Sequence, residues 1–113
     1  MENACDLSKR VCIPCAGGVP LLGPLVREAL LDQLDDGWYI VDEHHLRRAY
    51  DFPDFLGALA FVNQVGEVAE AVGHHPELQL GWGHATVEIW THAINGLSEA
   101  DFILAAKIDN LSP

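Results

Sequence analysis

The feature that most constrains the fold is a long amphipathic helix predicted in the middle of the chain. Between Asp54 and Val72, apolar residues recur at spacings of three and four, which places Phe55, Leu59, Val62, Val65, Ala69 and Val72 on one helical face. Pro53 stands at the start of this segment and Gly73 just past its end, which is the asymmetry that helix boundaries favour. This helix is the clearest element that the sequence predicts.

Pairs of short β-prone runs flank the helix on both sides. Before it, strands are predicted over 38–41 and about 46–52, with 42–45 as the turn between them. After it, strands are predicted near 77–82 and 85–92. In the last strand, the side-chain alternation puts Ala85, Val87 and Ile89 on one face and Thr86, Glu88, Trp90 and His92 on the other.

Two further helices complete the pattern. The first starts at Pro24 and is ended by the Asp-Asp-Gly run at 35–37, while the last starts with the capping box of Ser98 and Asp101 and runs to about Asn110. The order is helix, two strands, helix, two strands, helix, and short connections within each strand pair favour antiparallel hairpins. We therefore expect an α+β fold in which helices cover one sheet, with residues 1–23 irregular and 24–113 a single domain.

Composition limits the classes of function. The chain has 113 residues, which suits one domain. Its 17 acidic and 6 basic side chains give a net charge of −11, which disfavours direct binding to nucleic acid or anionic lipid. No uninterrupted apolar run is long enough to span a membrane, and the acidic N-terminus lacks a signal-peptide layout. With three cysteines, an odd number, a cytoplasmic protein is expected.

Candidate chemistry begins where the long helix ends. Gly73 allows the chain to leave the helix in a left-handed conformation, and Pro76 pushes the residue before it toward an extended one. His74 and His75 therefore sit at a constrained helix exit. Glu70 lies one helical turn before His74, close enough in sequence for its carboxylate to orient or charge that ring.

A second group of polar residues follows the last predicted strand. His92 is expected at the strand end, and Asp101 falls in the first turn of the last helix. If both segments end at the same edge of the sheet, three imidazoles and a carboxylate meet in one cleft. Each residue also has a simpler interpretation: a surface histidine for His92, a solvated helix residue for Glu70, and a helix cap for Asp101.

The combined spacing resembles the signature of the pterin-4a-carbinolamine dehydratases. Glu70-x-x-x-His74-His75-Pro76 is followed by Trp82 after five residues, by His92 after nine more and by Asp101 after eight more. The resemblance extends over residues 37–110 and includes Gly37-Trp38, the three phenylalanines 52, 55 and 61, Thr91-His92 and the run 96–101.

The resemblance implies a four-stranded antiparallel sheet with helices packed on one face, and a homodimer or homotetramer. It also implies an enzyme that removes water from 4a-hydroxytetrahydrobiopterin or a related pterin to give the quinonoid dihydropterin, with no metal or organic cofactor. By position, the catalytic residues would be His74, His75, His92 and Asp101, and Glu70, Pro76, Thr91 and Trp82 would bind the substrate. Of the histidines, His74 and His92 would lie near the departing hydroxyl. His75 would take the proton from the ring nitrogen or bind the pterin.

Two departures from many animal members concern the substrate. Leu78 stands where those members have an aromatic residue, and the N-terminal segment carries Cys12-x-x-Cys15. A comparable cysteine pair occurs in a plant and microbial subgroup for which roles near molybdopterin metabolism have been considered. Two alternatives to the dehydratase remain open. The same histidines and Asp101 could bind zinc or iron, or the chain could be a non-catalytic protein-interaction module.

Overall fold

The computed structural model describes residues 7–9 and 21–111. A 3-10 helix, η1 (Leu7–Lys9), comes first and is followed by helix α1 (Pro24–Leu31) and strands β1 (Tyr39–Val41) and β2 (His45–Asp51). Helix α2 (Phe55–Val72), strands β3 (Glu77–Gly81) and β4 (His84–Ile89), the 3-10 helix η2 (His92–Ile94) and helix α3 (Glu99–Asp109) complete the chain. Cys5, Cys12 and Cys15 lie outside the described residues, and the proposed division at residue 23 remains a prediction.

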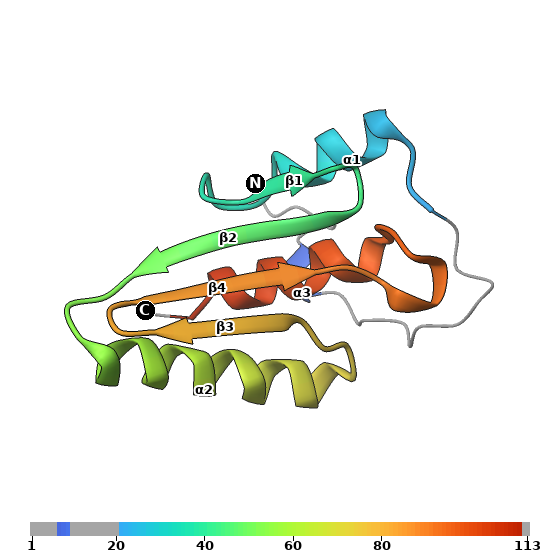
Figure 1. The fold of residues 1–113 in the computed structure, drawn as a ribbon. Coiled ribbons are helices and arrows are strands. Elements are labelled where there is room, and N and C mark those ends of the chain that lie inside the picture. Colours follow the sequence, from blue (N-terminus) through green and yellow to red (C-terminus); the bar gives the residue numbers. More distant parts are fainter. Residues whose placement is uncertain (1–6, 10–20, 112–113) are drawn as a thin grey trace.

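The four strands form one antiparallel sheet in the order β1-β2-β4-β3, which confirms the predicted α+β fold and its two hairpins. Figure 1 shows α2 alongside β3 and α3 behind the sheet. The β1–β2 turn carries positive φ at Asp42 and Glu43, and Gly83, with φ of 77°, turns the chain between β3 and β4. The expected strand face is confirmed, because Ala85, Val87 and Ile89 are fully buried.

Helix α2 begins and ends as its sequence predicts. The Asp54 carboxylate caps its first turn by accepting from the Gly57 backbone N–H at 2.8 Å, and Gly73 ends it with φ of 73°. By length and mean hydropathy (1.2) alone, α2 is the one described helix that could cross a membrane. In the fold, however, Phe61 and Val65 pack into the core, while Leu56 on the outer face is 72% exposed.

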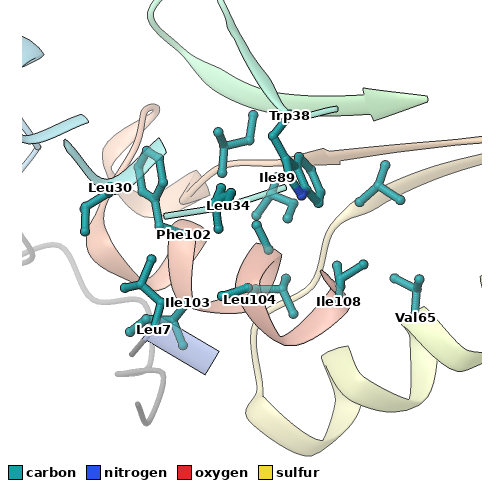
Figure 2. Close-up of a cluster of buried hydrophobic side chains, with 14 of the residues drawn as sticks. Leu7, Leu30, Leu34, Trp38, Val65, Ile89, Phe102, Ile103, Leu104 and Ile108 are labelled. Carbon is teal, nitrogen blue, oxygen red and sulfur yellow. The ribbon is translucent and has the colours of Figure 1, made fainter. Parts of the chain in front are cut away.

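Helix α3 supplies the centre of the core. Eight of its residues are buried, so it is covered on nearly all sides. Figure 2 shows Phe102, Ile103, Leu104 and Ile108 of this helix gathered with other buried side chains. These come from α1, from α2, from β4 and from the segment between α1 and β1. Leu7 from η1 also joins this core, within the segment that the sequence predicted to be irregular.

Two predicted boundaries were wrong. Helix α1 ends at Leu31 rather than near Asp35, because the backbone N–H groups of Gln33 and Leu34 form tighter i to i−3 bonds. Strand β4 ends at Ile89 rather than at His92. The chain leaves the sheet there, because Thr91 pairs with Gly96 in an isolated bridge that closes a turn around η2.

The C-terminal end of α3, opposite the end that follows η2, is anchored by a polar cluster. The Asp109 carboxylate accepts from the Trp38 indole at 2.8 Å, from the Asp35 backbone N–H at 2.9 Å and from the Arg48 guanidinium at 3.0 Å. The Arg48 side chain also covers the ring of Tyr50, with 4.6 Å between the guanidinium carbon and the ring centroid. Burial raises the pKa of Asp109 and holds that of the Tyr50 hydroxyl well above its usual value.

Candidate active site

The left-handed turn at Gly73 sends the two neighbouring histidines in different directions. The backbone N–H groups of Gly73 and His74 both donate to the Ala69 carbonyl, at 2.9 and 3.3 Å, which fixes the exit from α2. His74 turns inward and is 4% exposed, whereas the His75 side chain is 59% exposed. The pair therefore supplies one buried and one solvent-facing imidazole.

His74 meets Asp101 in the interior. Its Nε2 lies 2.6 Å from Asp101 Oδ1, and the Asp101 side chain is completely buried. The other carboxylate oxygen, Oδ2, accepts from the Thr91 hydroxyl at 2.9 Å and from the Ser98 backbone N–H at 2.8 Å. The Thr91 and Ser98 hydroxyls bond each other at 2.7 Å. This network joins the exit of α2, the end of β4 and the start of α3.

Asp101 thus serves as a helix cap and as a partner of an imidazole at the same time. Oδ2 caps α3 through Ser98, as the capping-box pattern predicted, while Oδ1 contacts His74. An ionised carboxylate can only accept hydrogen bonds, so the Nε2 of His74 carries the proton in this contact. The cap interpretation and the site interpretation are compatible because each uses a different oxygen.

Glu70 contacts a different histidine from the one its spacing suggested. Its Oε2 lies 2.6 Å from the Nε2 of His75, and both side chains are exposed. The expectation that Glu70 would orient His74 was wrong, because the turn at Gly73 carries His74 inward and leaves His75 above the last turn of α2. An exposed pair of this kind adds little stability, but it restricts how the His75 ring sits.

The three histidines line one pocket. It has a volume of about 340 Å³ and is lined by Gly73, His74, His75, Pro76, Glu77 and His92. The arrangement follows from the antiparallel pairing, since β3 begins where β4 ends and Glu77 is paired with Glu88. His92 is exposed at the start of η2, and its ring stacks on Trp90 with 4.5 Å between centroids and 8° between planes.

Trp82 and Thr91 do not line this pocket. Trp82 lies in the β3–β4 turn, 71% exposed, and the five residues of β3 carry it about 17 Å from the pocket end of the sheet at the usual rise per residue. Thr91 is buried beneath the pocket and holds Asp101 instead. Their assignment to substrate binding therefore stays a prediction that this single chain does not support geometrically.

Sequence reasoning missed three residues around the site. Ser98 was identified only as a cap, although its hydroxyl and backbone both enter the Asp101 network. Glu77 lines the pocket because it follows Pro76 directly, and position in the chain was the available signal. Trp90 was placed on the same strand face as His92, but its stacking on that ring depends on the turn after β4, which the sequence pattern did not reveal.

A metal centre has no geometric support in the part of the chain that the structure describes. Within residues 7–9 and 21–111, no group of three or more His, Cys, Asp or Glu side chains is arranged to hold a metal ion. His74 and Asp101 bond each other, and His75 bonds Glu70.

Comparisons with known proteins place the chain in a family. Residues 21–111 match the family model for pterin 4 alpha carbinolamine dehydratase. Two relatives provisionally named pterin-4-alpha-carbinolamine dehydratases come from Rubrobacter xylanophilus and Rickettsia bellii. They are 52% and 49% identical to this chain, covering 94% and 98% of it and 98% of each relative.

A solved structure agrees with these sequence matches. The crystal structure of a transcriptional coactivator/pterin dehydratase from Brucella melitensis superimposes with a TM-score of 0.73 at 33% identity, and the match covers 79% of this chain and 95% of that one. The family-model match over residues 21–111 contains the whole pocket and the buried network beneath it. The chain belongs to the pterin-4a-carbinolamine dehydratase family.

Proposed function

We propose that this chain removes water from a 4a-hydroxytetrahydropterin, with 4a-hydroxytetrahydrobiopterin as the reference substrate, by acid–base catalysis from histidine and without a metal or organic cofactor. The observation that carries the proposal is the convergence of three imidazoles on one pocket, one of them held by a fully buried carboxylate. Family membership supports the same reaction class.

The reaction requires two proton transfers. An acid gives a proton to the 4a-hydroxyl as the carbon–oxygen bond breaks, so that water leaves instead of hydroxide. A base takes the proton from the ring nitrogen as the carbon–nitrogen double bond forms. Imidazole can perform either step near neutral pH, and each well-placed group contributes about 10²–10⁴-fold.

The contacts suggest how the roles are divided. Asp101 holds His74 at Nε2, which fixes the ring where it lines the pocket. His92 faces the same pocket from η2, and we place these two rings near the departing hydroxyl. His75, which Glu70 orients, would take the proton from the ring nitrogen or bind the pterin. Pro76 forms part of the pocket wall, where it would contact the flat ring.

The test is a dehydratase assay with synthetic carbinolamine in metal-free buffer. His74→Ala and His92→Ala should each lower the rate by about 10²–10⁴-fold. His84→Ala is a matched control, because His84 is an exposed histidine at the opposite end of β4. Its rate should equal that of the wild type. Full activity in both pocket variants would show that catalysis lies elsewhere, and parallel assays with other pterins, including molybdopterin-related ones, would define the substrate.

We also propose that the protein is a homodimer or homotetramer. Leu56 and Phe55 leave apolar surface exposed on α2, and a domain of this size gains burial from association. Light scattering of the purified protein should give a multiple of the 12.4 kDa chain mass, and Leu56→Glu should shift it toward the monomer. A monomer at micromolar concentration would contradict this. The cytoplasmic location remains a prediction, to be tested by cell fractionation.

A protein-interaction role is the second candidate, because the related Brucella protein is described as a transcriptional coactivator as well as a pterin dehydratase. The acidic surface, with a net charge of −11, favours a protein partner over nucleic acid. If pterins neither bound nor reacted while one protein co-purified at a fixed ratio, this role would replace the dehydratase.

A further inference from the structure

We propose that Trp90 and the β1–β2 turn act together as a positioning device for His92. This inference rests on the proposed dehydratase function and adds residues that no part of the acid–base scheme uses. His92 is exposed, so packing in the core cannot fix its ring. The ring instead lies flat on the indole of Trp90, with 4.5 Å between centroids and 8° between planes. An offset stack of this kind restrains the tilt and translation of the imidazole.

Trp90 supports His92 without lining the pocket. His92 lines the pocket whereas Trp90 does not, so the indole covers part of the imidazole without occupying the substrate space. Removing the indole would let His92 sample other rotamers. Because misplacement of a reacting group by about 1 Å can cost about 10²-fold in rate, such a backing residue has a measurable effect on turnover.

His44 in the β1–β2 turn and His45 at the start of β2 hold Trp90 in place. The rings of His44 and His45 contact the indole, with centroid separations of 5.1 and 5.7 Å. His44 is fixed by its neighbours, since its Nδ1 lies 3.0 Å from the Nδ1 of His45 and its Nε2 lies 3.0 Å from Asn95 Oδ1. Asn95 ends η2 in the left-handed conformation, so the turn is joined both to the indole and to the segment that carries His92.

The base of this arrangement is anchored in the sheet. Glu88 Oε2 accepts from the Arg47 guanidinium at 2.6 Å and lies 3.3 Å from the Nε2 of His45. Arg47 and Glu88 are direct cross-strand partners in β2 and β4. The hydrogen bond to Glu88 raises the pKa of Arg47. His45 is thus held by the central strands, and the contacts continue through His44 and Trp90 to His92.

The experiment compares Trp90→Leu, which removes the flat ring, with Trp90→Phe, which keeps one. Trp90→Leu should lower kcat by about 10- to 100-fold and change KM by less than about threefold, while Trp90→Phe should recover most of kcat. Asn95→Gly keeps the left-handed conformation but removes the contact with His44, and should give a smaller loss of kcat. His84→Leu, which removes an exposed ring at the opposite end of β4, is the control and should leave both constants unchanged.

A spectroscopic measurement tests the stack independently of activity. In the wild-type protein the ring protons of His92 should show an upfield NMR shift from the indole ring current, and Trp90→Leu should abolish it. Unchanged His92 shifts in Trp90→Leu, unchanged kcat, or equal losses in Trp90→Leu and Trp90→Phe would each overturn the proposal. An inactive wild type that still shows the shift would instead refute the dehydratase function and leave the stack established.

Discussion

The substitution Asp101→Asn separates the two tasks of the buried carboxylate. An asparagine has the same shape, but one of its two ends is a donor. If the amide oxygen occupies the Oδ2 position, it still accepts from Ser98 and Thr91, and the amide nitrogen then faces the Nε2 of His74. Two donors cannot face each other, so the His74 proton must move to Nδ1. The opposite amide orientation would leave the buried Ser98 N–H facing a donor.

The stability cost follows from the three hydrogen bonds. Bonds to a charged group contribute about 1.5–3 kcal/mol and neutral ones about 0.5–1.5, so each bond to Asp101 weakens by roughly 1 kcal/mol. Removing a buried charge offsets part of this loss. We therefore expect Asp101→Asn to lower the free energy of unfolding by about 1–3 kcal/mol, which leaves a folded protein.

The rate should fall much further than the stability. Asparagine carries no negative charge to stabilise a protonated His74 ring, so His74 becomes a poorer proton donor to the departing hydroxyl, as happens when a triad aspartate is changed to asparagine. The expected loss in kcat is about 10²–10⁴-fold. Urea denaturation measures the stability, a dehydratase assay measures kcat, and ¹⁵N NMR of the imidazole reports the tautomer.

The matched control is Asp109→Asn, the same substitution at the other end of α3. Asp109 also accepts from three donors but lies outside the pocket, so its variant should lose stability without losing kcat. The reasoning about His74 would be refuted if Asp101→Asn were folded and kept its rate within about threefold of the wild type. Such a result would reduce Asp101 to a helix cap.

Three further predictions concern stability. Desolvation raises the pKa of Asp109 above its usual 3.8, so the stability that this carboxyl contributes is present at low pH and is lost as the pH rises through its folded-state pKa. The difference in unfolding free energy between the wild type and Asp109→Asn should therefore fall as the pH increases from about 4. A pH-independent difference would contradict this. Phe102→Ala should cost about 3–5 kcal/mol in urea denaturation because Phe102 is fully buried, and a loss below 1 kcal/mol would mean that the core has refilled the space. Gly73→Ala should cost about 1–2 kcal/mol, because φ there is 73°, and should lower kcat by displacing His74; normal activity would show that the turn tolerates a side chain.

Local patterns in the sequence were sufficient for the order of the helices and strands and for the boundaries of α2. The boundaries of α2 could be predicted because Pro53 and Gly73 act within one turn of the helix ends, and the start of α3 because Ser98 and Asp101 lie three residues apart. The two hairpins followed from their short connections. These signals operate over a few residues, so they are present in the sequence whatever the rest of the chain does.

The pairing of the site residues was beyond such patterns. The spacing suggested that Glu70 would meet His74, but a single left-handed residue reverses the partners and gives His75 to Glu70 and His74 to Asp101. For the same reason β4 was predicted to extend to His92, although the strand ends at Ile89.

The sequence by itself determined the α+β architecture, the helix caps and the list of histidines and carboxylates that the family signature contains. The tertiary structure alone decided that His74 is buried against Asp101, 27 residues away, and that His92 rests on Trp90 beside a turn from the other hairpin. The physical reason is that helix periodicity and capping are set by neighbours along the chain. The direction of a side chain after a turn depends instead on how distant strands and helices pack, and no short spacing encodes that packing.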